Sequence, residues 1–176
     1  MGAKNPNELL EFTDTLSKYK PRKRAVNSRR KGSNFERGLA TQLNELFETK
    51  EFARTPGSGA FATTHELPEH LQIHGDLITP EDFKYVIEAK CGYKVDIDDL
   101  LRQNSELHKF IRQAKKESKR AKKPWLLVYK KTRKDTLVFT ESEFPIAQMA
   151  SISLDYNVYI YRWDDILGLP KSHFFK

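Results

Sequence analysis

The 176-residue sequence predicts an α/β protein in which helices flank a mixed central β-sheet. Amphipathic helical patterns occupy residues 34–49 and 97–121. Short runs rich in β-branched and aromatic residues lie between these segments and after them, as expected of strands. A chain of this length fits one domain with a single core, and helices packed on a sheet are a common way to build that core.

Basic residues are concentrated in two stretches of a chain whose net charge is +7. Residues 18–31 hold eight Lys or Arg and no acid, and residues 109–134 hold twelve Lys or Arg and one acid. Segregated positive charge is typical of a surface that contacts a polyanion such as DNA. Solvated helix surface and a flexible tail are the alternative explanation.

The sequence gives no sign of a membrane span or a secretion signal, because it has neither a long apolar run nor an apolar N-terminal region. Its single cysteine, Cys91, suits a reducing compartment. We therefore expect a cytoplasmic protein without a membrane partner.

The first 32 residues are expected to form a separate N-terminal extension. Residues 7–17 are compatible with a short amphipathic helix, and the basic residues that follow have almost no apolar neighbours. We expect them to form an extended arm. The candidate DNA contacts in this arm are Lys20, Arg22, Lys23, Arg24, Arg29, Arg30 and Lys31.

Residues 34–49 are predicted to form a core helix. Apolar residues recur there at helical spacing, at Phe35, Leu39, Leu43, Leu46 and Phe47. Ser33 and Glu36 match the S-x-x-E capping box, in which the Glu36 side chain only satisfies a backbone donor. Glu36 could instead point toward a neighbouring strand.

A strand at residues 51–55 leads into a glycine-rich loop that begins at Pro56. Gly57 and Gly59 permit a tight turn and a close approach of the backbone to a ligand, with Ser58 exposed between them. An ordinary glycine-rich loop explains the pattern equally well.

Residues 75–92 are predicted to form a hairpin that brings charged side chains together. Strands at residues 76–78 and 85–87 flank turn-forming residues 79–82. With the turn centred near Asp82, Asp76 lies opposite Glu88, about 5 Å away. Glu88 and Lys90 are two residues apart and therefore share a face of their strand.

The second half of the chain is predicted to hold a long helix and several strands. The helix, residues 97–121, has an apolar stripe and a basic side that includes Arg112 and Lys116, while Gln113 could reach the edge of the hairpin. The alternative for Gln113 is a surface polar residue. Strands are expected at residues 125–131, 136–140 and 157–163, with a helical turn at 164–170.

Two carboxylates and an ammonium group converging on one spot could bind a divalent cation. Asp76, Glu88 and the backbone carbonyl of Ala89 are hard oxygen donors, which favour Mg²⁺ or Mn²⁺. Such an ion activates water for phosphodiester cleavage, and Lys90 could stabilise developing charge. Glu36 could bind a second ion or a metal-bound water. The alternative is a structural cross-strand ion pair.

The order of these segments resembles a known nuclease superfamily. G-D-L-I at residues 75–78 and I-E-A-K at 87–90 resemble the D-x(n)-E-x-K signature of the PD-(D/E)XK nucleases. With R-K-G-S-N-F-E-R-G-L at 30–39 and R-T-P-G-S-G-A-F at 54–61, the sequence is similar to archaeal-type and phage-type Holliday junction resolvases. The similarity covers residues 30–130. Gly75 stands where the superfamily name has proline, and the loop at residues 62–74 is longer than in compact archaeal relatives.

This resemblance implies a restriction-endonuclease-like core in residues 33–176 and a role for each matching residue. It implies Glu36, Asp76 and Glu88 as acidic active-site residues and Lys90 as the catalytic lysine. It also implies Ser58 as the loop serine near the scissile phosphate and Gln113 as a helix glutamine. Arg54, Arg112 and Lys116 join the basic arm as candidate DNA contacts.

The leading hypothesis is a Mg²⁺-dependent DNA endonuclease that acts on four-way junctions or other branched DNA in recombination or repair, as a homodimer. Paired cuts across a junction need two active sites, which a two-fold dimer provides. One alternative is a restriction-like or repair nuclease acting on duplex or flap DNA. Another is a nucleic-acid-binding protein without catalysis, whose carboxylates form structural ion pairs.

Overall fold

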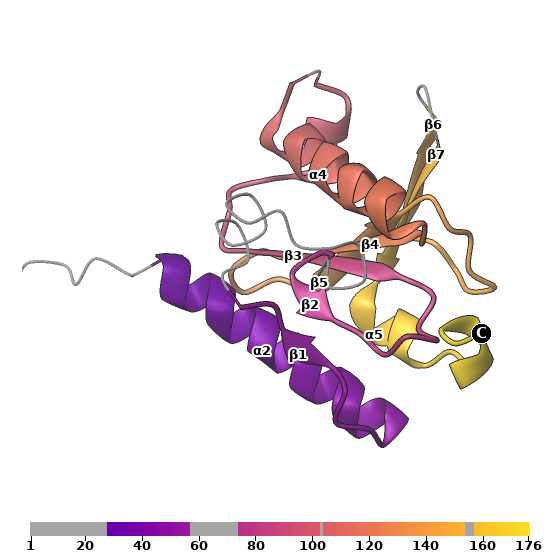
Figure 1. Cartoon of the computed structure of the whole chain (residues 1–176). Coiled ribbons are helices and arrows are strands. Elements are labelled where there is room, and N and C mark those ends of the chain that lie inside the picture. The colour runs from indigo at the N-terminus through magenta and orange to yellow at the C-terminus, as the bar shows by residue number, and fades with distance from the viewer. Residues whose placement is uncertain (1–27, 57–73, 103, 154–156) are drawn as a thin grey trace, which may run out of the picture.

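A five-stranded mixed sheet forms the centre of the molecule in the computed structural model, which describes residues 28–56, 74–102, 104–153 and 157–176 (Figure 1). The strand order is β3-β4-β5-β7-β6. β3 (Val86–Cys91) and β4 (Trp125–Lys130) are parallel, whereas β5 (Thr136–Thr140), β7 (Asn157–Arg162) and β6 (Ala150–Ser153) continue the sheet in antiparallel pairs. The predicted α/β architecture with a mixed sheet is confirmed.

Helices cover both faces of this sheet. α2 (Ser28–Phe47) and α5 (Trp163–Leu167) pack with one face, through a cluster that includes Leu43, Leu126 and Val128. α4 (Glu106–Ala121) packs on the other face, where Leu107 and Ile111 meet alternate strand residues. The alternation along β4 assigns odd-numbered residues to the α4 side and even-numbered ones to the α2 side.

α2 begins at Ser28, earlier than the predicted start at residue 34. The prediction assigned Arg29, Arg30 and Lys31 to an extended arm because they lack apolar neighbours, and that assignment is wrong. Arg and Lys favour helix and need no buried face, so the helix extends beyond its apolar stripe. The capping box is also wrong, since Ser33 lies inside the helix. The domain boundary expected after residue 32 falls within α2, and that division of the chain stays a prediction.

The helix predicted over residues 97–121 is interrupted. A 3₁₀ helix, Ile97–Leu100, precedes α4, and Ser105 caps α4 by accepting a hydrogen bond from the His108 N–H at 3.3 Å. Asn104 adopts a positive φ of 64° just before this cap. Short polar side chains favour turns and caps over helix interiors, which explains the break. The buried stripe of α4 is confirmed.

The hairpin predicted at residues 75–92, with strands at 76–78 and 85–87, is wrong as a strand pair. β2 (Leu77–Ile78) pairs antiparallel with β1 (Ala53–Arg54), while β3 extends to Cys91 beside β4. Asp76 still touches β3, because its N–H donates to the Ile87 carbonyl at 2.9 Å. The predicted strands at 125–131, 136–140 and 157–163 are confirmed to within a residue at their ends, whereas β6 was not predicted.

Within the described residues, no helix is long and apolar enough to cross a membrane. The predicted helix at residues 7–17 and the basic residues up to 27 lie outside the described part of the chain.

Candidate active site

Gly75 and Thr55 fix the backbone of Asp76 against the edge of β3. Gly75 has φ +77°, and a Cβ atom there would lie 2.6 Å from the Ile87 carbonyl oxygen, so only glycine permits this approach. The Thr55 hydroxyl donates to the Gly75 carbonyl at 3.1 Å, and the Thr55 N–H donates to the Asp76 carbonyl at 3.0 Å. The backbone on both sides of the Asp76 Cα is therefore held by hydrogen bonds.

The Asp76 side chain lies beside the strand that carries Glu88 and Lys90. Its Oδ2 atom accepts a hydrogen bond from the Ala89 N–H at 2.9 Å and one from the Lys90 ammonium at 3.0 Å. The carboxylate thus takes the place that a backbone acceptor would occupy in a continued sheet. This contact explains why Asp76 meets Glu88 and Lys90 although the predicted strand pairing is wrong.

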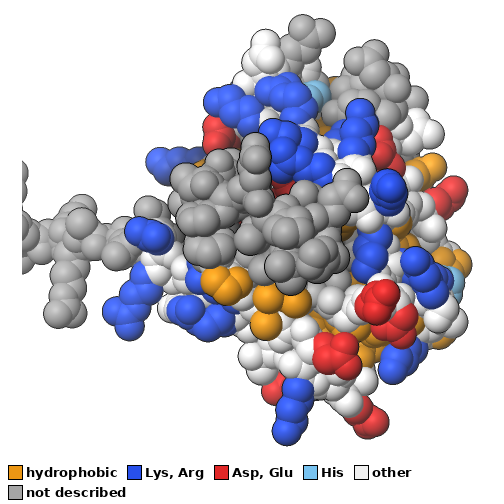
Figure 2. All heavy atoms as spheres, viewed as in Figure 1, with side chains coloured by type: hydrophobic (Ala, Val, Ile, Leu, Met, Phe, Trp, Pro, Cys, Tyr) orange, Lys and Arg blue, Asp and Glu red, His pale blue; other side chains and the backbone are white. Residues whose placement is uncertain are grey.

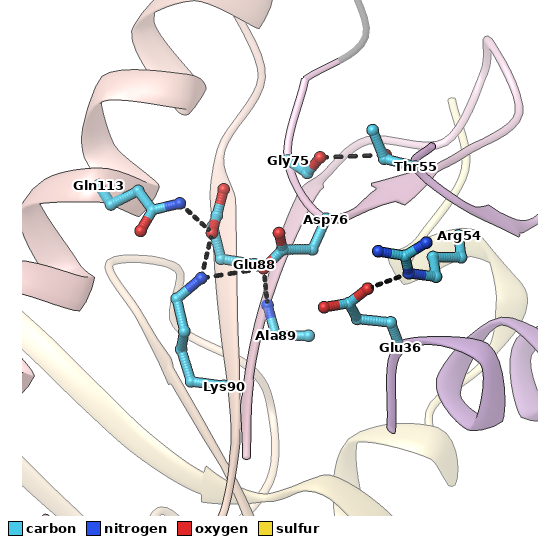
Figure 3. Close-up of polar contacts among 9 residues, drawn as sticks. All are labelled: Glu36, Arg54, Thr55, Gly75, Asp76, Glu88, Ala89, Lys90 and Gln113. Carbon is cyan, nitrogen blue, oxygen red and sulfur yellow. Dashed lines mark hydrogen bonds and ion pairs between the residues drawn. The ribbon is translucent and has the colours of Figure 1, made fainter. Parts of the chain in front are cut away.

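Glu88 points toward α4 and is almost completely buried, with 1% of its surface exposed. Its Oε2 atom accepts hydrogen bonds from the Lys90 ammonium at 3.0 Å and from the Gln113 amide at 2.8 Å (Figure 3). Gln113 therefore reaches Glu88 from α4, although it is also an exposed surface residue, as the alternative for it had it. The structure brings together Asp76, Glu88, Lys90 and Gln113.

Burial, and after it the negative charge of Asp76, raise the pKa of Glu88 to about 8 against the opposing effect of Lys90. Burial alone lowers the pKa of Lys90, but the charges of Glu88 and Asp76 outweigh that effect and the pKa is raised. Lys90 is therefore a permanent cation at neutral pH. Its ammonium also lies 5.9 Å from the centre of the Phe110 ring on α4, within the range of a cation–π contact.

The donor set fits a hard divalent cation. The Val86 N–H donates to the Pro124 carbonyl, which precedes β4. The backbone N–H and C=O groups of even-numbered β3 residues therefore point toward β4. Those of the odd-numbered residues Ile87 and Ala89 point to the opposite edge, toward Asp76. The Ala89 carbonyl thus lies on the same strand edge as the Asp76 carboxylate. Two buried carboxylates and this carbonyl are oxygen donors that suit Mg²⁺ or Mn²⁺.

Glu36 is placed on the other side of β3 from Gln113 (Figure 3). Its carboxylate forms an ion pair with Arg54 at 2.5 Å, joining α2 to β1. Among the described residues, no three His, Cys, Asp or Glu side chains come close enough together to hold a metal ion, so Glu36 does not complete a cluster with Asp76 and Glu88. Its role with a second ion or a metal-bound water stays a prediction.

The predicted DNA contacts fall into three groups. Arg29, Arg30 and Lys31 are exposed on the first turn of α2, and Arg112 and Lys116 are exposed on α4. Arg54 is engaged with Glu36. Lys20, Arg22, Lys23 and Arg24, together with the loop residue Ser58, lie outside the described residues. Figure 2 shows Lys and Arg side chains gathered over α4 and around the N-terminal end of α2.

Thr55 and Phe110 were not predicted as parts of the site. Thr55 belongs to the same short block as Arg54, but a single threonine before a proline carries no recognisable signal. Phe110 is an ordinary apolar residue of its helix by pattern, and only the three-dimensional structure shows that it contacts Lys90.

Residues 27–173 match a protein family described as "Phage putative PDDEXK endonuclease". The chain is also similar to Protein D14 of Escherichia phage T5, with 33% identity over 132 residues that cover 69% of this chain and 76% of that protein. No solved structure matches the chain significantly.

Proposed function

The chain belongs to the phage family of PD-(D/E)XK endonucleases, and on that premise we propose that it is a divalent-metal-dependent enzyme that cuts branched DNA. The observation that carries this proposal is the convergence of Asp76, Glu88 and Lys90 on one edge of β3, with each carboxylate 3.0 Å from the ammonium. A structural ion pair needs only two of these groups. A second buried carboxylate in the cluster raises the energetic cost of the site and favours a functional explanation.

Each residue of the centre has a distinct part in the proposed reaction. Asp76, Glu88 and the Ala89 carbonyl would hold Mg²⁺ or Mn²⁺, which supplies a Lewis acid and lowers the pKa of bound water. Lys90 places a fixed positive charge where negative charge develops on the phosphate. Gln113 and the Ala89 N–H each hold one carboxylate oxygen, so the two carboxylates keep their orientation without the ion.

The proposed substrate is DNA with a four-way junction or another branch. Two exposed basic surfaces, on α4 and at the start of α2, support binding to a phosphate backbone. Cutting both strands of a junction symmetrically requires two active sites, so we propose a homodimer. Duplex or flap DNA is the alternative substrate, and DNA binding without cleavage is the alternative function.

The test is incubation of the protein with a four-way junction, a flap and a linear duplex, in Mg²⁺, Mn²⁺ or EDTA. Wild type should cut the junction fastest and only with a metal, and Asp76→Asn should lose this activity. Asp82→Asn is a matched control, because Asp82 is an exposed aspartate in the turn before β3. Equal cleavage rates on duplex and junction would contradict branched DNA as the substrate, but not the active-site assignment. Cleavage by Asp76→Asn at the wild-type rate would remove the active-site assignment.

A further inference from the structure

Tyr93 is an exposed aromatic side chain that the proposed reaction does not use. Among the described residues, four large hydrophobic side chains are exposed, and Tyr93 is the aromatic member, with 45% of its surface accessible. It follows β3 by two residues, so it lies at the end of the strand that carries Glu88 and Lys90. An exposed ring at this position calls for an explanation, because aromatic side chains contribute most when they are covered.

The Tyr93 ring is connected to the catalytic lysine through one other ring. Its centre lies 4.8 Å from that of Phe110, at an interplanar angle of 67°, so the two rings pack edge to face. Phe110 in turn lies under the Lys90 ammonium. Tyr93 is therefore at the rim of the active centre, supported by a buried aromatic residue of α4.

The backbone at Tyr93 is fixed by hydrogen bonds to β4. The Gly92 N–H donates to the Lys130 carbonyl at 3.0 Å, and Gly92 has φ +85°, which turns the chain out of β3. The Tyr129 hydroxyl donates to the Tyr93 carbonyl at 2.7 Å and accepts from the Val95 N–H at 3.2 Å. A ring on such a fixed segment binds a planar partner without a large loss of conformational entropy.

The charges around Tyr93 favour a polyanionic partner. Lys94 is the next residue and is exposed, and Lys90 lies beyond Phe110. The nearest exposed acid along the chain, Asp96, forms an ion pair with Lys131. Positive charge next to an exposed aromatic face is the combination that binds single-stranded nucleic acid, since the charge contacts phosphate and the ring stacks on a base.

We propose that Tyr93 stacks on a DNA base with an uncovered face, next to the phosphate that is cut. This inference rests on the proposed function and refines its substrate class. A base within a continuous duplex has both faces covered by its stacked neighbours. A base at the branch point of an open junction is still paired, but it lacks a stacked neighbour on one side and so has a free face. Tyr93 thereby favours DNA in which base stacking is interrupted beside the cut.

The competing explanation is that Tyr93 only covers Phe110 from water. Two substitutions separate the explanations. Tyr93→Phe keeps the aromatic face, and Tyr93→Leu keeps an apolar cover over Phe110 but removes that face. Thermal unfolding of both variants checks that the fold is retained.

The experiment measures binding in EDTA to a four-way junction with 2-aminopurine at the branch point, and to a linear duplex with the same base. Wild type and Tyr93→Phe should quench the fluorescence of the junction probe. Tyr93→Leu should not quench it and should bind the junction about 5- to 150-fold more weakly, the range expected for loss of one stacked base. Its affinity for the duplex should be unchanged.

Quenching and junction affinity of Tyr93→Leu equal to wild type would overturn the inference, as would an equal loss of affinity for junction and duplex. Because binding is measured without metal, the result does not depend on cleavage. A protein that stacks on the probe but never cuts contradicts the proposed function alone, and one that cuts junctions without stacking contradicts only the role of Tyr93.

Discussion

Glu88 is the most deeply buried charged residue of the proposed centre, and three side chains set its environment. Lys90 and Gln113 donate to the same oxygen, Oε2, while Asp76 brings a second negative charge nearby. Lys90 therefore neutralises part of a site that holds two carboxylates. A bound divalent cation would take the place of the proton that Glu88 otherwise keeps, which links the burial of Glu88 directly to metal binding.

Gly75 is expected to be the least replaceable small residue of the site. In Gly75→Ala, the new Cβ would lie 2.6 Å from the Ile87 carbonyl oxygen, and the backbone would keep a φ of +77° that side chains disfavour. We expect this variant to lose both stability and cleavage, because the shift needed to relieve the contact moves Asp76. Thermal unfolding and the cleavage rate together measure the two effects.

Gly92→Ala is the matched control for that substitution. Gly92 has φ +85°, but nothing lies within 4 Å of a Cβ at this position. The Gly92→Ala substitution should therefore lower the free energy of unfolding only by the backbone strain, about 1–2 kcal/mol. If Gly75→Ala were no worse than Gly92→Ala in stability and activity, the close approach at Ile87 would have no importance for the site.

The chemistry of the site residues was more predictable than their contacts. Spacing alone placed Glu88 and Lys90 on one face, because side chains alternate along any strand. The position of Asp76 was predicted from a strand pairing that does not exist, and it is correct because the Asp76 N–H and carboxylate both bond to β3. The pairing of Glu36 with Arg54 depends on how α2 lies against β1, which no local pattern encodes.

At the scale of elements, α4 serves both the core and the proposed DNA surface. Leu107, Ile111 and Ala114 are fully buried against the sheet, while Arg112 and Lys116 are exposed. Gln113 lies between these two sides and bonds to Glu88. The helix thus connects the surface proposed to contact phosphates with a side chain of the proposed catalytic centre.

Replacing Arg112 and Lys116 together with Ala is expected to weaken DNA binding and its dependence on salt. Each lost phosphate contact lowers the slope of log K against log salt by about 0.9 for duplex DNA, so the slope should fall by about 2. The measurement is DNA affinity over a range of salt concentrations. Stability should change little, because both side chains are exposed.

Lys50→Ala combined with Lys171→Ala provides the control with the same change in net charge. Both lysines are exposed: Lys50 follows the C-terminal end of α2, and Lys171 lies near the C-terminus. These two ends are in the lower half of the molecule in Figure 1, whereas α4 lies at the top. This pair should leave the salt slope unchanged. An equal effect of the two double variants would show that net charge, and not the α4 surface, determines binding.

Helix and strand patterns were predictable where packing follows a simple period. Strands β4 and β5 and the buried stripe of α4 were recognised from apolar residues alone. The start of α2 was not, because exposed Arg and Lys extend a helix without an apolar pattern. β6 was missed because Ala150, Ser151 and Ser153 are small and carry little strand signal.

For the whole molecule, the buried Glu88 makes stability depend on pH. Its pKa is raised from 4.5 to about 8, so between these values the folded protein keeps a proton that the unfolded chain has released. The free energy of unfolding should therefore fall as the pH rises through this window in the absence of metal. Thermal unfolding in EDTA at several pH values measures this slope.

Glu88→Gln should flatten the slope, because the amide does not titrate. Added Mg²⁺ should raise the unfolding temperature of wild type most at the upper end of the window, where Glu88 is ionised, and should have less effect on Glu88→Gln. A slope that Glu88→Gln leaves unchanged would assign the pH dependence to other groups.

The most direct test of the proposed centre is single-turnover cleavage of a four-way junction by saturating protein as Mg²⁺ is titrated. Wild type and Asp82→Asn should show no cleavage in EDTA and the same dependence on Mg²⁺. Asp76→Asn and Glu88→Gln should each be more than about 100-fold slower, since loss of groups that merely support metal ligands already costs 10–100-fold. Cleavage that persists in EDTA, or wild-type rates in either variant, would contradict the assignment of Asp76 and Glu88 as the metal-binding carboxylates.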